Sequence, residues 1–257
     1  MMPGGAPRRL SRLWPGCARG AWLALCLWLA ALTPGATHAQ QIESARYVMP
    51  TGHYAHGVLG DAVEYSGLRI TTSDGASYLV RFSEGGRVFE DIAPRLWDLT
   101  GDGLPEVVVI ETDPPVGAQL AIYSLRGEAI TKIAATPHIG QTNRWLAPIG
   151  ATDLDGDDHI EIAYIDRPHL AKTLRIWRFR DGRLTQVATA EGLTNHKIGW
   201  DHIPGGIRDC GTGPEMITAD AGWRRIMAST LQQGRIVTRG IARYSGPDSL
   251  NAARDCP

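Results

Sequence analysis

Two short acidic segments of the chain carry oxygen-bearing side chains at the same spacing. Residues 98–106 and residues 153–161 each have such side chains at positions 1, 3, 5 and 9. Alternate residues of a tightly wound loop can point inward together, so these oxygens can converge on one point. An oxygen cage with several carboxylates suits a hard cation, and a flexible loop favours Ca²⁺ over Mg²⁺. Zn²⁺ fits less well because neither segment centres on nitrogen or sulfur ligands.

Each segment also offers a backbone carbonyl at position 7, which completes the predicted set of calcium ligands. In the first loop the predicted ligands are Asp98, Thr100, Asp102, the carbonyl of Leu104, and Glu106. In the second loop they are Asp153, Asp155, Asp157, the carbonyl of His159, and Glu161. The second loop has one more carboxylate, so we expect it to bind more tightly, unless strain at Asp158 offsets the extra charge. Asp158 stands where the first loop has Gly103, and aspartate tolerates left-handed backbone better than most residues.

Two other interpretations of these loops are open. An EF-hand also begins with alternating Asp residues, but it takes a Glu at position 12 and lies between helices. Position 12 is Val109 in one loop and Tyr164 in the other, each inside a strand-like run, which disfavours an EF-hand. The remaining alternative is a pair of Asp-Gly turns that bind nothing. Crowded carboxylates repel one another without a cation, so the metal site is favoured.

The acidic segments belong to a longer repeat. Their first residues lie 55 positions apart, an apolar run follows each, and residues 209–215 form a weaker third copy. A fixed period of this size indicates a repeat architecture. Residues 120–123 and 173–179 have the branched and aromatic side chains of strands, and Gly-containing turns separate such runs. Three to four strands per period is the size of one propeller blade, and no segment has the pattern of a long amphipathic helix.

Residues 174–180 alternate apolar and basic side chains, with one break at Ile176-Trp177. This pattern predicts a strand with one buried face, bulged at the break. We interpret the arginines of this strand as a solvated face, and a ligand-binding patch is the alternative.

The two loops and their trailing apolar runs resemble FG-GAP/VCBS-type repeats, the calcium-loop blades of integrin α-chain propellers and of many exported bacterial proteins. The resemblance covers residues 98–206 and implies an all-β, β-propeller-like fold in which the ten ligands named above hold calcium. Residues 40–257 allow about four blades of roughly 55 residues, some of them degenerate. We expect residues 42–49 to complete the last blade. The third copy has Ile207 at position 1 and Gly211 at position 5, so it lacks two of the ligands.

The N-terminus has the order of a secretory signal. Residues 1–39 contain four arginines and no acid, then an uncharged run of 12 residues, then small residues around position 39. That run is too short to span a bilayer, which needs roughly 20 apolar residues. We therefore expect cleavage after Ala39, no membrane span afterwards, a single domain over residues 40–257, and a periplasmic or secreted location. Of the four cysteines, only Cys210 and Cys256 would remain, and an oxidising compartment favours a disulfide between them.

Composition and motifs disfavour several classes of protein. With 43% hydrophobic residues and a net charge of −1, the chain is too apolar for disorder and lacks the basic field that nucleic acid binding requires. No Gly-x-Ser-x-Gly, phosphate-binding glycine loop or Cys-x-x-Cys motif occurs. The leading hypothesis is an exported calcium-binding module that binds a protein or glycan ligand or acts in envelope assembly, without catalysis.

The alternative is a secreted hydrolase for a phosphate- or sugar-containing substrate, with calcium in a structural role. It requires His53, His196 or Asp201 in a pocket with two carboxylates. We interpret the histidines at 53, 56, 196 and 202 as loop or packing residues.

Overall fold

The computed structural model describes residues 40–256, and the expected signal segment, residues 1–39, lies outside them. The described residues form seventeen strands and one short helix, which confirms the all-β prediction. The strands are β1 (Ile42–Thr51), β2 (Glu64–Thr72), β3 (Ser77–Arg81), β4 (Val88–Phe89), β5 (Arg95–Trp97), β6 (Glu106–Asp113), β7 (Gly117–Arg126), β8 (Ala129–Ala135), β9 (Leu146–Thr152), β10 (Ile160–Asp166), β11 (Thr173–Arg180), β12 (Arg183–Glu191), β13 (Leu193–Thr194), β14 (Gly206–Asp209), β15 (Pro214–Asp220), β16 (Arg225–Gln232) and β17 (Arg235–Arg243). The helix is α1 (Pro247–Arg254).

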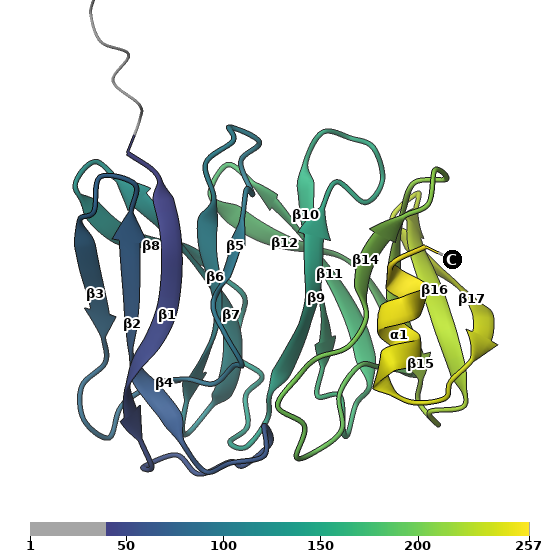
Figure 1. The fold of residues 1–257 in the computed structure, drawn as a ribbon, viewed down its shortest axis with the longest axis horizontal. Coiled ribbons are helices and arrows are strands. Elements are labelled where there is room, and N and C mark those ends of the chain that lie inside the picture. The colour runs from purple at the N-terminus through teal and green to yellow at the C-terminus, as the bar shows by residue number, and fades with distance from the viewer. Residues whose placement is uncertain (1–39, 257) are drawn as a thin grey trace, which may run out of the picture. The chain divides into compact units, whose positions relative to one another are not determined.

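The strands pair into three antiparallel sheets (Figure 1). The first has the order β1-β2-β4-β6-β7-β8, with β3 beside β2 and β5 beside β6; the second has the order β12-β11-β10-β9; and the third has the order β13-β15-β16-β17, with β14 beside β15. Within these sheets, β5–β8, β9–β12 and β14–β17 are three four-stranded units with the same up-and-down order. Each acidic segment joins the first and second strands of one unit, so the sequence period is a structural period.

The second strand of each unit lies in the interior. Nearly every residue of β6 and β10 is buried, as expected of a strand covered on both faces. The strand predicted over residues 174–180 is β11, and its pairing with β12 shifts register between Ile176 and Trp177. The sequence prediction of a bulge at this break is therefore confirmed.

The expectation that residues 42–49 complete the last blade is wrong. β1 pairs with β2 along its whole length, and Ile42 packs with Leu68 and Ile70 in a core of the first sheet. β4 then joins β2 to β6, since Phe89 pairs with both Tyr65 and Glu111. The N-terminal strands are thus merged with the first four-stranded unit. A two-residue strand leaves too short a pattern to be recognised in the sequence.

Within the described residues, β17 pairs on one side only, with β16. Its exposed side chains include Arg235, Arg239 and Arg243, and charged residues on an edge strand oppose further strand pairing. Helix α1, which the sequence patterns did not predict, packs its buried Leu250 against Ile217 in the third sheet.

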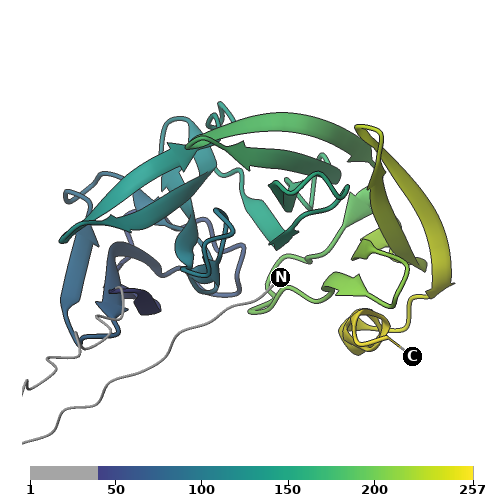
Figure 2. The same cartoon turned by 90° about the horizontal axis from the view of Figure 1, so that it is seen from above.

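One hydrophobic core links the three sheets. It contains Val108 of β6, Ile162 of β10 and Met216 of β15, all fully buried. The hairpins β7–β8, β11–β12 and β16–β17 line one side of the described residues (teal, green and yellow in Figure 2), and β12 contacts both β8 and β17. Within residues 40–256, no helix has the length and hydropathy needed to cross a membrane.

Candidate metal centre

The first acidic loop connects β5 to β6 and is wrapped around its own carboxylates. The backbone N–H groups of Gly101 and Gly103 each donate to Asp98 at 2.8 Å, and the N–H of Leu104 donates to Asp102 at 2.9 Å. Glu106, the first residue of β6, is buried and accepts the N–H of Leu99 at 3.0 Å. These bonds bend the backbone so that the loop closes over the start of β6. Thr100 is exposed at its outer edge.

The second loop, between β9 and β10, repeats this pattern residue by residue. Asp153 accepts the N–H groups of Gly156 at 2.7 Å and Asp158 at 3.0 Å. Glu161 is fully buried and accepts the N–H of Leu154 at 2.8 Å. Although partial burial acts against it, backbone N–H donors lower the pKa of Asp153. The two loops therefore share one conformation, as their sequences predict.

The sixth position of each loop requires a left-handed backbone. Gly103 has φ 81° and Asp158 has φ 64°. Glycine adopts this region without strain, whereas a side chain there costs free energy, least for Asn and Asp. The second loop therefore has a strained backbone at Asp158, as the replacement of glycine by aspartate at this position predicts.

The structure brings three of the ten predicted ligands together most closely. Carboxylate oxygens of Asp153, Asp155 and Glu161 lie within 4.8 Å of one another, close enough to share a metal ion. Asp157 instead accepts the backbone N–H of His159, as Asp102 accepts that of Leu104 in the first loop.

An arginine reaches into the second loop. From β11, the guanidinium of Arg178 contacts Glu161 at 2.5 Å, Asp155 at 2.6 Å and Asp157 at 2.9 Å. Its side chain is only 23% exposed, so the interpretation of this strand face as solvated is wrong at Arg178. Arg175 departs from that interpretation in the same way, because it pairs with the buried Asp166 at 2.8 Å. Sequence reasoning missed Arg178 because its carboxylate partners come close only through the register of β10 and β11.

The first loop has no such cation. Ser124 of β7 faces Glu106 from the position that Arg178 occupies opposite Glu161, and its hydroxyl lies 3.4 Å from the carboxylate. Within residues 40–256, no basic side chain lies within 4 Å of the carboxylates of Asp98, Asp102 or Glu106. Burial, together with the neighbouring charges of Asp102 and Asp98, raises the pKa of Glu106. A cation bound in this loop would stabilise the ionised form of Glu106 and so offset both its burial and the repulsion from the neighbouring carboxylates.

The third copy is neutralised and closed without a metal. Glu215 of β15 pairs with Arg208 at 2.8 Å and with Arg239 at 2.6 Å. Cys210 in the same loop forms a disulfide with Cys256, their Cα atoms 5.8 Å apart, which confirms the predicted pairing. Arginines and a covalent link thus hold the strand connection where the calcium ligands are missing.

Comparison with known families agrees with this internal pattern. Residues 98–164 match the model of an FG-GAP-like repeat. The chain contains an FG-GAP-like repeat. The match begins at position 1 of the first loop and ends in β10, just beyond the second loop, so both predicted calcium loops lie inside it. No curated protein matches the chain in sequence.

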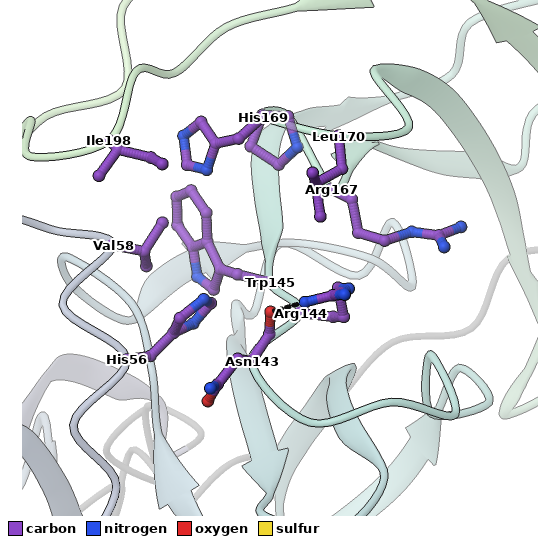
Figure 3. Close-up of a pocket in the computed structure, with 10 residues that line it drawn as sticks. His56, Val58, Asn143, Arg144, Trp145, Arg167, His169, Leu170 and Ile198 are labelled. Atoms are coloured by element: carbon purple, nitrogen blue, oxygen red, sulfur yellow. Dashed lines mark hydrogen bonds between the residues drawn. The ribbon is translucent and has the colours of Figure 1, made fainter.

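A cavity lies at the opposite ends of the repeat's strands (Figure 3). It is lined by residues of the segments before β2, before β9, after β10 and before β14, and has a volume of about 320 Å³. His56 lines it and pairs through Nδ1 with the buried Glu90, which also accepts the hydroxyl of Thr112. The fully packed Trp145 lies beside His56 in the lining and donates its indole N–H to the carbonyl of Glu90 at 2.7 Å.

The histidines singled out in the sequence have different surroundings. His56 lines the cavity, and His196 is buried and bonded to His169, which also lines the cavity. His53 contacts the carbonyl of Gly86 elsewhere. Asp201 is exposed and pairs with His202. The pair of His56 with Glu90 could not be found from the sequence, because the two residues are 34 positions apart in irregular segments.

A buried acid near this region predicts a pH effect on stability. Burial, reinforced by the charges of Glu90 and Asp61, raises the pKa of Glu64 from 4.5 to about 9. Between these values the folded chain holds a proton that the unfolded chain has lost, so stability falls as pH rises, by up to about 1.4 kcal/mol per unit. Glu64→Gln should remove this contribution, giving a flatter pH dependence and higher stability at pH 8. Urea unfolding between pH 5 and 8.5 measures it, with the exposed Glu84→Gln as control; parallel curves for wild type and Glu64→Gln would contradict it.

Proposed function

We propose that the protein is an exported, calcium-stabilised β-propeller-like module that binds a protein or glycan ligand or acts in envelope assembly. The observation that carries the calcium part is the pair of equivalent loops, each wrapped on an Asp and backed by a buried Glu. Both belong to an FG-GAP-like repeat. The disulfide between Cys210 and Cys256 supports an oxidising compartment, periplasmic or extracellular.

The two loops differ in how much they need the ion. Arg178 already places a positive charge among the carboxylates of the second loop, whereas the first loop has three carboxylates and Thr100 without a basic partner. We therefore assign the greater calcium dependence to the first loop. The sequence alone favours tighter calcium binding by the second loop, because that loop has one more carboxylate. The positive charge of Arg178 offsets this extra carboxylate.

Calcium titration into chelator-treated protein tests this function. An ion that binds only the folded state stabilises it by about 2.7 kcal/mol at 100 times its Kd, so the melting temperature should rise by roughly 5–11 °C. The double variant Asp98→Asn, Asp102→Asn should lose most of this rise. Asp209→Asn, in the third loop, should melt at a lower temperature but keep the calcium-dependent rise. An unchanged melting temperature at millimolar calcium would refute the proposal.

One observation favours the hydrolase alternative, namely the pair of His56 with the buried Glu90 beside a cavity. The cavity lining holds no carboxylate and no serine, threonine or cysteine hydroxyl or thiol. General acid–base hydrolysis of a glycoside requires a second carboxylate, and His53 and Asp201 lie elsewhere. The binding function therefore has the better support.

A further inference from the structure

The cavity at the strand ends opposite the acidic loops has a one-sided charge. Arg144 and Arg167 are its charged lining residues, apart from the histidines, and no acid lines it. The guanidinium of Arg167 makes two hydrogen bonds to Asp166 at 2.8 and 3.0 Å, and the same carboxylate also pairs with Arg175 at 2.8 Å. Arg144 donates to the carbonyl of Asn143 at 2.7 Å and forms no ion pair with a carboxylate of residues 40–256. Arg144 is therefore the arginine of the lining whose donors are not taken by a carboxylate, which suits one carboxylate of a ligand.

The rest of the wall is mainly apolar. Trp145 and Val58 are each 2% exposed and form the packed inner part. Leu170 and Ile198, 63% and 70% exposed, stand at its outer edge from two different loops (Figure 3). These two side chains extend the apolar wall to the mouth of the cavity, and pockets for small ligands are lined mainly by apolar and aromatic side chains.

A histidine pair adds a hydrogen-bond acceptor. The carbonyl of Trp200 can only accept, so His196 donates to it through Nε2–H at 2.9 Å. Burial lowers the pKa of His196 and of His169 to about 4, so both rings are neutral at pH 7. The bare Nδ1 of His196 then accepts from Nε2–H of His169 at 3.0 Å. This leaves Nδ1 of His169, a residue of the cavity wall, as an acceptor without a protein donor in the described residues.

The guanidinium, the apolar wall and the hydrogen-bond acceptor together indicate which chemical groups a ligand of this cavity would carry. From this arrangement we propose that the cavity binds a carboxylate next to an apolar side chain and an amide N–H, the chemistry of an apolar C-terminal residue of a peptide or of an N-acylated apolar amino acid. The carboxylate pairs with Arg144, the side chain packs on Trp145 and Val58, and the N–H donates to His169. A phosphate dianion fits less well, because Arg167, the second arginine of the lining, already donates two hydrogen bonds to Asp166.

This inference rests on the binding role proposed above but not on calcium, so the two can fail separately. The test is calorimetric titration of the calcium-replete protein with N-acetyl-leucine and with its uncharged amide. We expect the acid to bind and the amide to bind at least tenfold more weakly. Arg144→Gln should weaken binding of the acid at least tenfold, and Arg235→Gln, at an exposed arginine of the last hairpin, should leave it unchanged.

A second titration distinguishes the two sources of this chemistry. A pentapeptide ending in leucine, used as the free acid and as the C-terminal amide, should bind more tightly than N-acetyl-leucine if peptide termini are the ligands. If the peptide is excluded while N-acetyl-leucine binds, the ligand is a small acylated amino acid; either result supports the proposal. Absence of binding at millimolar acid, equal binding of acid and amide, or unchanged binding to Arg144→Gln would overturn it. Melting curves of Arg144→Gln establish that the variant is folded.

Discussion

In calcium-free buffer, replacement of Arg178 by serine should destabilise the protein by about 3 kcal/mol, and calcium should restore most of the loss. The variant leaves Glu161, which is fully buried, beside Asp155 without a compensating charge. Removal of one partner of a buried ion pair costs roughly 3–5 kcal/mol, and the 23% exposure of Arg178 places this case at the lower end. A divalent cation among the same oxygens supplies the missing charge. Urea unfolding with chelator and with calcium measures both effects.

The reciprocal change, Ser124→Arg, should make the first loop less dependent on calcium. It places a guanidinium opposite Glu106, where Arg178 stands opposite Glu161. The matched control for Arg178→Ser is Arg180→Ser on the same strand. Arg180 is 66% exposed and pairs with the exposed Asp181, so its loss should change stability little. If Arg178→Ser and Arg180→Ser have the same stability with and without calcium, Arg178 does not substitute for a metal charge.

Loss of the disulfide should have an effect of similar size. Cys210 and Cys256 are separated by 46 positions, and in the chain-entropy model a loop of this length contributes about 4 kcal/mol. The double variant Cys210→Ala, Cys256→Ala should therefore melt roughly 8–16 °C lower. The link also holds α1 near β14, where the side chain of Arg208 bonds to the carbonyl of Ala253 at 2.6 Å.

Differential scanning calorimetry of the double variant checks this prediction. The reductant-treated wild type should have the same melting temperature as the variant, and reductant should not change the melting temperature of the variant itself. The double variant could instead melt within about 2 °C of the wild type, a shift that corresponds to about 0.5–1 kcal/mol. That result would contradict the prediction and show that the packing of Leu250 holds the C-terminus without the disulfide.

The parts of this architecture that the sequence predicts are local. The spacing from Asp98 to Glu106 and from Asp153 to Glu161 places the acids in two similar loops, and the hydrogen bonds of Asp98 and Asp153 show that the loops share one conformation. The bulge after Ile176 follows from the broken alternation of its strand. Each of these features is set by residues within about ten positions of one another, so a single pattern contains the necessary information.

The parts that the sequence does not predict depend on long-range register. Arg178 joins the second loop only because β10 pairs with β11 in one register, and a one-residue slip would turn its side chain to the other face. Glu90 follows the two-residue strand β4, and its pairing with His56 depends on how the first sheet packs. The same holds for β1, whose alternating pattern suits any sheet edge and does not specify β2 as its partner.

A calcium ion that completes the first acidic loop would fix the connection between β5 and β6. Anomalous diffraction from crystals grown with calcium would locate this ion, because the method observes its position. We expect a peak coordinated by Asp98, Asp102 and Glu106, and we expect it to be lost in the Asp98→Asn, Asp102→Asn variant. Clear density for that loop with no peak at millimolar calcium, while Asp98 keeps its bonds to Gly101 and Gly103, would contradict this expectation.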